Sequence, residues 1–171
     1  MSKKGYTTIT KKTASEDKTL IAYVDGSYDV ETKIYGSGIV FLHGEEEHFF
    51  FSGNNPEYSS SRNVAGEISA SIYAMEYAKE KGYEKIIIHH DYIGLEKWCT
   101  GEWKTNKKIT IAYKNCYDYF SKFLTIQFNW VRGHSGDHYN TLADQLAKKA
   151  LESKNFLDLI TKYLYKTGLN F

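Results

Sequence analysis

Several features that mark common protein classes are rare or missing in this sequence of 171 residues. It contains one proline and 13 glycines, which excludes collagen-like, proline-rich and low-complexity chains. No apolar run approaches the roughly 20 residues that a membrane-spanning helix needs, and the polar, lysine-rich N-terminus is unlike a secretory signal. We therefore expect a cytoplasmic protein without a membrane partner.

Cysteine is also scarce. The sequence holds only Cys99 and Cys116, and they do not form a Cys-x-x-Cys zinc or redox motif. Two cysteines are too few for the disulfide framework of a small secreted domain. We expect two reduced, half-buried thiols.

The chain carries almost no net charge. Lysine and arginine number 22 against 21 aspartates and glutamates, which gives a formal charge of +1. This balance argues against a histone-like protein that binds nucleic acid through bulk positive charge, although a local basic patch stays compatible with it. Aromatic residues make up 16%, which excludes disorder as the dominant state, and the length fits about one domain.

Hydrophobic periodicity predicts an alternation of strands and helices. Three short β-prone runs joined by polar turns predict an antiparallel meander at residues 20–24, 39–42 and 48–52. Apolar side chains at steps of four, four and three then predict an amphipathic helix from residue 64 to Gly82. The rest of the pattern predicts strands at 85–90 and 124–131 and helices at 92–99, 107–123, 141–152 and 155–165. The apolar run at 85–90 is typical of a strand buried on both faces.

This order of elements favours an α/β fold. It predicts a five-stranded mixed sheet, with three antiparallel strands followed by parallel strands and with helices on both faces. Residues 1–18, which contain five lysines, are interpreted as a flexible tail or linker remnant. Residues 19–152 form the expected domain, and residues 153–171 a C-terminal helical extension.

Four acidic residues occupy special positions in this layout. Asp25 ends the first strand and Asp91 directly follows the fourth, while Glu67 and Asp144 lie in the first turns of two helices. Ligands of α/β proteins collect outside the carboxyl ends of the strands. Four carboxylates meeting there would repel one another unless a cation bound between them. Oxygen ligands without cysteine favour Mg²⁺ or Mn²⁺ over zinc.

Each of these residues also has a structural explanation when it is taken alone. Asp25 with the following glycine is typical of a hairpin turn. Glu67 and Asp144 would complement helix dipoles, and Asp91 would cap the next helix. Only their joint position at one edge of the sheet favours a metal site.

A histidine adds a candidate for proton transfer. His134 lies between glycines after the last strand, on a loop rather than in a core. Most loop histidines have no chemical role, but an imidazole beside carboxylates can move protons near neutral pH. His89 and His90 alternate across a strand and are both interpreted as structural, although His90 neighbours Asp91.

These residues lie in four sequence blocks that resemble type 1 ribonuclease H, the enzyme that cuts the RNA strand of RNA–DNA hybrids. The similarity covers roughly residues 20 to 151, and the last block is the most specific. The blocks are Tyr23-Val24-Asp25-Gly26-Ser27; Arg62-Asn63-Val64-Ala65-Gly66-Glu67; His89-His90-Asp91-Tyr92; and Val131-Arg132-Gly133-His134-Ser135-Gly136 with Asn140-Thr141-Leu142-Ala143-Asp144.

The resemblance implies an endoribonuclease that hydrolyses the RNA strand of hybrids and leaves 5′-phosphate and 3′-hydroxyl ends. It implies two Mg²⁺ ions, with Mn²⁺ as a substitute, and a role for His134 in proton transfer or product release. The metal ligands would be Asp25, Glu67, Asp91 and Asp144. The substrate-binding residues would be Gly26, Ser27, Asn63, Trp103, Lys104 and Asn140.

The sequence departs from the family pattern at two positions that concern the substrate. Val64 stands where many members have a second asparagine, which puts one minor-groove contact in doubt. The basic segment between the middle helices of some relatives is replaced by the short stretch from Trp103 to Lys108. We expect a monomer. Two alternatives stay open: a DNA nuclease or resolvase built on the same fold, and a catalytically inactive hybrid-binding relative.

Overall fold

The structure, a computed structural model, describes residues 18–132 and 137–166. Its centre is a five-stranded sheet in the order β3-β2-β1-β4-β5. The first three strands are antiparallel, β4 runs parallel to β1, and β5 runs parallel to β4, which confirms the predicted mixed sheet. The strands are β1 (Thr19–Tyr28), β2 (Tyr35–Leu42), β3 (Glu46–Gly53), β4 (Lys85–His90) and β5 (Thr125–Trp130).

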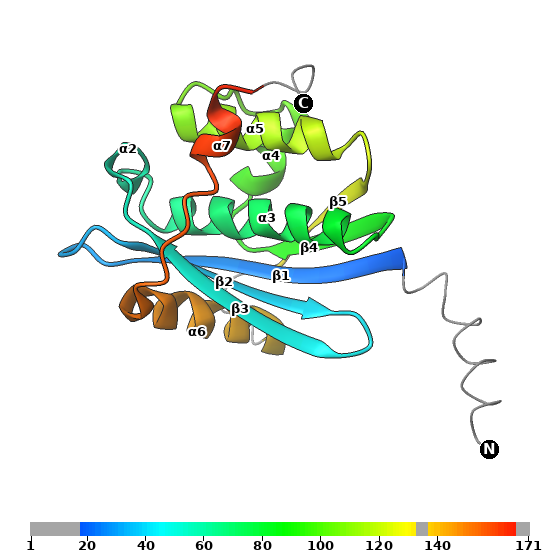
Figure 1. Ribbon diagram of the computed structural model, residues 1–171, viewed down its shortest axis with the longest axis horizontal. Helices are drawn as coiled ribbons and strands as arrows, with labels where there is room; N and C mark the ends of the chain where they lie inside the picture. Colours follow the sequence, from blue (N-terminus) through cyan, green and yellow to red (C-terminus); the bar gives the residue numbers. More distant parts are fainter. Residues whose placement is uncertain (1–17, 133–136, 167–171) are drawn as a thin grey trace.

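Helices cover both faces of the sheet. They are α2 (Pro56–Ser59), α3 (Asn63–Glu80), α4 (Gly94–Thr100), α5 (Lys108–Phe120), α6 (His138–Ser153) and α7 (Thr161–Leu164). Figure 1 shows α3 on one face, with α4, α5 and α7 stacked beyond it, and α6 alone on the other face. The molecule is therefore layered, with the sheet between α3 and α6.

Glycines allow these helices to approach the strands closely. A Cβ atom on Gly26 of β1 would lie 2.0 Å from the carbonyl oxygen of Asn63 in α3. On the opposite face, a Cβ atom on Gly38 of β2 would lie 2.2 Å from the carbonyl oxygen of Ala143 in α6. Backbone packs directly on backbone at both places, so any larger side chain would push the helix off the sheet.

The central helix α3 lies deep in the core. Ile68, Ile72 and Met75 are fully buried, as the predicted periodicity requires. Most of the other buried positions of the helix hold glycine, alanine or serine. Ser69 and Ser71 donate their hydroxyl groups to carbonyl oxygens one turn back in the same helix, at 2.8 and 3.0 Å. From residue 65 to residue 72 every position is buried, so this part of the helix is packed on all sides and its backbone is held in one position.

Strand β1 is longer than the sequence suggests. Asp25 pairs with Gly38 in the ladder with β2, and pairing continues to Tyr28 opposite Tyr35. The chain reverses beyond Tyr28, where Lys33 donates its backbone N–H to the carbonyl of Asp29. Asp25 is thus inside a strand, and both its expected place at the strand end and the hairpin-turn explanation are wrong.

The structural explanations of the other carboxylates also fail. Helix α3 begins at Asn63 and α6 at His138, so Glu67 and Asp144 lie in second turns and neither first turn is acidic. The influence of a helix dipole falls off within the first turn. Helix α4 begins at Gly94 after an uncapped Ile93, so Asp91, which follows β4 as predicted, does not cap it.

Strand β4 and the C-terminal segment differ from expectation as well. Alternate residues of β4 are buried and half-buried, so the strand is not buried on both faces. The expected helix over 155–165 is limited to Thr161–Leu164. Ser52 of the edge strand β3 donates its N–H to Asn155 and accepts from the N–H of Leu157, both at 2.9 Å. These backbone groups pair with the sheet edge and so do not form a helix.

Two simpler expectations concern cysteine and the membrane. Cys99 and Cys116 are free thiols, both buried, more completely than the half-burial we expected. Within the ranges that the structure describes, no helix combines the length and the apolar character that crossing a bilayer demands.

Candidate active site

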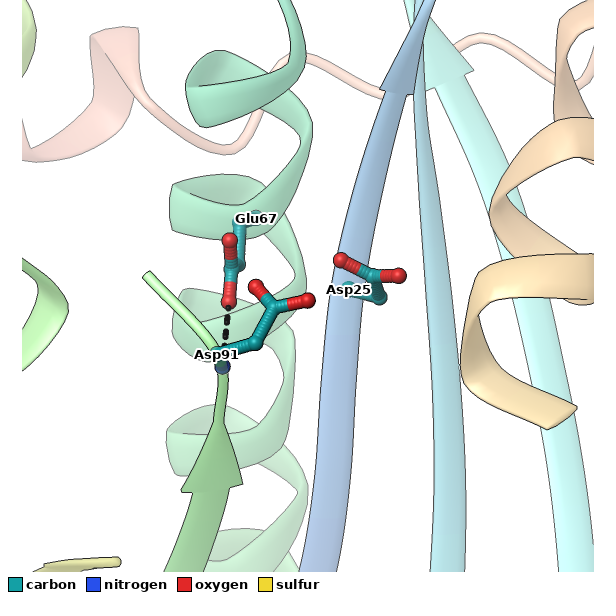
Figure 2. Close-up of side chains that lie close together, drawn as sticks. All are labelled: Asp25, Glu67 and Asp91. Carbon is teal, nitrogen blue, oxygen red and sulfur yellow. Dashed lines mark hydrogen bonds between the residues drawn. The ribbon is translucent and has the colours of Figure 1, made fainter. Parts of the chain in front are cut away.

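Three carboxylates from three different elements meet above the middle of the sheet. Asp25 lies in β1 and Glu67 in α3, and Asp91 is the residue that directly follows β4. One oxygen atom of each side chain lies within 4.8 Å of the other two. Figure 2 shows the Asp91 side chain between Glu67 and Asp25, with its carboxylate directed toward Asp25. Groups 24 to 66 residues apart in the sequence thus form one cluster.

The close contact between β1 and α3 explains why Asp25 and Glu67 are neighbours. A Cβ atom on Gly26 would lie 2.5 Å from the backbone nitrogen of Glu67, so only glycine allows this spacing. The backbone N–H of Gly26 also donates to Asp25 Oδ1 at 2.9 Å and orients that carboxylate. Gly26 therefore sets both the orientation of the Asp25 carboxylate and the distance between Asp25 and Glu67.

Glu67 is the most deeply buried member of the cluster, with 1% of its surface exposed. Its Oε2 atom accepts long hydrogen bonds from the backbone N–H groups of Asp91 (3.4 Å) and Tyr92 (3.5 Å). Glu67 therefore connects α3 to the end of β4. The first of these bonds is the dashed line in Figure 2.

The cluster is electrostatically unfavourable when it is ionised. Burial, reinforced by the charge of Asp91, raises the pKa of Asp25 to about 8, although the Gly26 N–H opposes the rise and Asp144 adds to it. Burial, with Asp91 and Asp25 next, raises the pKa of Glu67 well above its ordinary range. Buried carboxylates that repel one another bind a cation strongly, because the cation removes both penalties.

Asp144 approaches the cluster from the other side of the sheet. It is about one-third exposed, and its Oδ2 atom lies 3.0 Å from the Lys148 ammonium group one turn along α6. Its charge raises the pKa of Asp25, so the two side chains are near each other. The structure thus brings Asp25, Glu67 and Asp91 into one tight group, with Asp144 beside it.

A pocket of about 220 Å³ opens at these residues. Its wall contains three of the carboxylates together with Gly26, Asn63, Asn140 and Thr141. Asn140 is 6% exposed and lies in the first turn of α6, where its N–H is held by Asp137 Oδ1 at 3.0 Å. Asn63, Asn140 and Thr141 are the polar, uncharged residues of the wall.

The other residues expected to bind substrate lie outside this pocket. Ser27 follows along β1. Trp103 packs edge to face against Tyr92 and Trp98, with ring centres 6.2 and 5.8 Å apart. Lys104 lines a neighbouring pocket of about 370 Å³, which also contains Tyr92. His134 lies outside the described residues.

Sequence reasoning missed the contacts that support Asp91. The indole N–H of Trp130 donates to the Asp91 carbonyl oxygen at 3.0 Å, and His90 Nδ1 lies 3.0 Å from the Tyr92 carbonyl oxygen. Both side chains bond to backbone carbonyl groups. Every residue has such a group, so the sequence does not show which one a side chain will meet. The one available clue was the place of Trp130 at the end of a strand, directly before the family motif that contains His134.

The donor set fits a hard divalent cation. All ligands are carboxylate oxygens, and no cysteine or histidine joins the group among the described residues. Mg²⁺ and Mn²⁺ prefer such oxygens, and an octahedral ion retains waters beside one or two carboxylates. An acidic cluster of this kind, next to a pocket with amide groups, is suited to metal-assisted hydrolysis of a phosphodiester.

Comparison with known proteins agrees with this chemistry. The sequence profile of the RNase H family matches residues 17–152. A protein of Pseudoalteromonas translucida named ribonuclease H is 31% identical over 152 residues, which cover 83% of this chain and 96% of that protein. A ribonuclease H of Chlorobium phaeobacteroides is 28% identical over 149 residues, covering 80% of this chain and 97% of that protein.

Solved structures show the same fold. The RNase H1 of Halobacterium salinarum superposes with a TM-score of 0.65 at 23% identity, covering 78% of this chain and 97% of that one. The N-terminal RNase H domain of a Mycobacterium tuberculosis protein gives a TM-score of 0.65 at 18% identity, covering 80% and 95%. The profile spans most of the chain and the sheet order agrees, so this chain belongs to the ribonuclease H family.

Proposed function

We propose that this protein is a metal-dependent endonuclease that hydrolyses the RNA strand of RNA–DNA hybrids and leaves 5′-phosphate and 3′-hydroxyl ends. The observation that carries the proposal is the buried group formed by Asp25, Glu67 and Asp91, with ligand oxygens within 4.8 Å of one another. Membership of the ribonuclease H family supports the choice of substrate.

The metal would be held by the carboxylates of the cluster. Asp25, Glu67 and Asp91 are the inner ligands, and Asp144 completes the set once it exchanges Lys148 for the cation. When bound, a pair of Mg²⁺ or Mn²⁺ ions activates a water molecule and stabilises the leaving oxygen of the phosphodiester. The raised pKa of Asp25 means that binding such ions also releases protons from the site.

The remaining residues would hold and align the nucleic acid. Asn63 and Asn140 present amide groups on the pocket wall, where sugar hydroxyls and base edges of a minor groove can bond to them. Gly26 and Ser27 offer backbone groups along β1 to the RNA strand.

Two further parts of the chain complete the proposed site. Lys104 lines the neighbouring pocket, and Trp103 packs against Tyr92 and Trp98, which also line it. Trp103 would contact the DNA strand by stacking and Lys104 by charge. His134, from the family motif, would assist proton transfer or product release.

The test is a cleavage assay with matched substrates. End-labelled RNA–DNA hybrid, duplex RNA and duplex DNA of one sequence are incubated with the protein in Mg²⁺ and, separately, in EDTA. We expect cleavage of the hybrid alone, only with metal, at internal positions of the RNA strand. Asp25→Asn should abolish cleavage while the circular dichroism spectrum stays that of the wild type.

Other outcomes of this assay would identify the alternatives. Cleavage of duplex DNA in place of the hybrid would assign the protein to the DNA nucleases that share the acidic cluster. Hybrid binding without cleavage in either metal would make it an inactive relative. Near wild-type turnover by Asp25→Asn would refute the role of the carboxylate cluster.

A further inference from the structure

Asp91 has to hold its carboxylate in place without support from a regular element. Strand β4 ends at His90 and α4 begins at Gly94, so Asp91 and Tyr92 lie in the bend between them. Side chains of regular elements are fixed by backbone ladders, whereas a residue in a bend depends on individual contacts. The contacts around this bend therefore decide how well the Asp91 carboxylate is positioned.

The peptide unit between Asp91 and Tyr92 is held from two sides. Its carbonyl oxygen accepts the indole N–H of Trp130 at 3.0 Å, and its N–H, that of Tyr92, points to Glu67 Oε2 at 3.5 Å. The C=O and N–H of a planar trans peptide point in opposite directions. Trp130 and Glu67 therefore bond to opposite sides of the Asp91–Tyr92 peptide unit and restrict its rotation about the chain.

Trp130 uses its polar atom on this backbone group although nearly half of its surface is exposed. It is the last residue of β5, next to β4 in the sheet, and its backbone pairs with His90. An exposed indole N–H can bond to water at no cost. The indole N–H therefore bonds to the Asp91 carbonyl because the pairing of Trp130 with His90 brings the two groups together at the ends of β5 and β4.

His90 holds the next peptide unit. Its side chain is fully buried, and Nδ1 lies 3.0 Å from the Tyr92 carbonyl oxygen, which also accepts the N–H of Leu95 at the start of α4. Across residues 18–132 and 137–166, no hydrogen-bond partner reaches its Nε2 atom. Glu96 Oε1 lies 3.8 Å from Nε2, which is too far for a hydrogen bond. A buried nitrogen without a hydrogen bond is costly, and a hydrocarbon side chain would fill the space without that cost. What the imidazole adds is the donor to Tyr92.

We propose that Trp130 and His90 are positioning residues for the metal ligand Asp91. Trp130 orients the peptide unit directly after Asp91, His90 orients the one after that, and both act on the carboxylate only through the backbone. This inference rests on the proposed function for the identity of the metal site. It does not depend on the choice of nucleic acid.

The first test is Trp130→Phe, which keeps an aromatic ring, although a smaller one, and removes the N–H. Binding of Mn²⁺ is measured from the electron paramagnetic resonance signal of the free ion, and cleavage is measured separately at saturating hybrid. Loss of a group that orients a metal ligand costs about tenfold to a hundredfold in affinity or activity. We expect Mn²⁺ binding to weaken about tenfold and kcat to fall by a similar factor, with KM for the hybrid within about twofold of wild type.

A matched control is Trp98→Phe in α4. Its ring packs against Tyr92 on the other side of the bend, 5.7 Å away between ring centres, so the substitution makes the same chemical change close by. We expect its Mn²⁺ affinity to equal that of the wild type. An equal loss in both variants, or unchanged affinity in Trp130→Phe, would overturn the proposal.

His90 is tested with two substitutions. His90→Asn keeps a donor at the position of Nδ1, and His90→Leu removes it at similar volume. Positioning predicts that Asn retains Mn²⁺ affinity within about threefold while Leu loses about tenfold. If His90→Leu does not fold, the proposal is tested by His90→Asn and Trp130→Phe. A tenfold loss of Mn²⁺ affinity in His90→Asn would contradict the role of the Nδ1 donor.

The two levels of proposal fail in different ways. A wild-type protein that binds Mn²⁺ but cleaves no hybrid would refute the proposed function and leave the metal-binding comparison valid. If the wild-type protein cleaves hybrid and the substitutions of Trp130 and His90 leave the Mn²⁺ affinity unchanged, only the positioning role is refuted.

Discussion

Asp25→Asn, the substitution expected to abolish activity, should also stabilise the protein in the absence of metal. Asp25 is 6% exposed and is surrounded by Glu67, Asp91 and Asp144. Asparagine has the same shape, cannot ionise, and keeps an Oδ1 atom to accept the N–H of Gly26. The substitution therefore removes the repulsion and the burial penalty of the charge without leaving a cavity or a lost hydrogen bond.

The size of the effect follows from the pKa of Asp25. That pKa is about 8 in the folded protein against 3.8 for an ordinary aspartate, a difference of about four units. At about 1.4 kcal/mol per unit, the ionised carboxylate costs up to about 6 kcal/mol of folding free energy. Rotation of the neighbouring carboxylates toward water reduces this cost, so we expect a gain of about 2–5 kcal/mol from the substitution.

The gain should depend on pH in one direction. Below about pH 4 the aspartate is neutral in both the folded and the unfolded chain, so the two variants are equally stable. As the pH rises from about 4 to 8, the unfolded chain loses the Asp25 proton while the folded chain retains it. The wild type therefore loses stability across this window, and the advantage of Asp25→Asn grows until about pH 8.

Thermal unfolding in EDTA, followed by circular dichroism at about pH 4, 6 and 8, measures this advantage. For a chain of this size, 1 kcal/mol shifts the midpoint by about 2–4 °C, so a gain of about 2–5 kcal/mol should raise the midpoint of Asp25→Asn by about 4–20 °C at pH 8. Asp118→Asn is the control, because Asp118 is an exposed partner of Lys114 on α5 and should shift the midpoint by at most about 2–4 °C. An Asp25→Asn midpoint at or below that of the wild type at pH 8, or an advantage independent of pH, would refute the reasoning.

Two further predictions concern the cation and the packing of α6. Saturating Mg²⁺, at about 100 times its dissociation constant, should stabilise the wild type by about 2.7 kcal/mol, and Asp25→Asn far less; equal shifts in thermal melts of the two proteins would contradict the ligand role of Asp25. Gly38→Ala places a Cβ atom 2.2 Å from the Ala143 carbonyl oxygen and should cost about 1–3 kcal/mol in urea unfolding. Because α6 carries Asp144, hybrid cleavage should fall as well, and wild-type values in both measurements would contradict the close approach.

The order of the elements could be predicted because it depends on local patterns. The apolar period of α3, the three strands of the meander and the strand before Asp91 are each encoded in adjacent residues, and all are present in the structure. The end of β1 is different. Asp25 with Gly26 has the composition of a turn, but the glycine is required because the backbone of α3 lies against it. A contact with a segment about 40 residues away has no local signal.

The C-terminal segment is a second case in which a long-range contact overrides the local pattern. Residues 155–165 have apolar side chains at spacings that suit a helix, yet Asn155 and Leu157 bond to Ser52 of β3. An exposed edge strand offers unpaired backbone groups, and a neighbouring segment of almost any sequence can satisfy them. Backbone pairing of this kind depends on where the chain passes, so side-chain periodicity could not reveal it.

The candidate site was predictable in its residues but not in its supports. The sequence pattern predicted that four carboxylates gather at one edge of the sheet, and the structure brings three of them together with Asp144 beside them, although only Asp91 lies at the expected strand end. The ligand roles of all four and the proton-transfer role of His134 stay predictions. The contacts of Trp130 and His90 with the bend after β4 are made to carbonyl groups, which every residue possesses. Only the folded backbone shows which carbonyl each side chain meets.

The rigidity of the core explains how carboxylates that repel one another are held close together. Glu67 is in a helix buried on most of its positions, and Asp25 is in a strand whose next residue packs against that helix with no side chain between them. Neither backbone can withdraw unless the contact at Gly26 opens, and opening it would expose the core around Ile68. The packing of these two backbones therefore holds the ligand oxygens within 4.8 Å of one another. This is why neutralising Asp25 should increase stability and leave the geometry unchanged, and why a cation should find its ligands already in place.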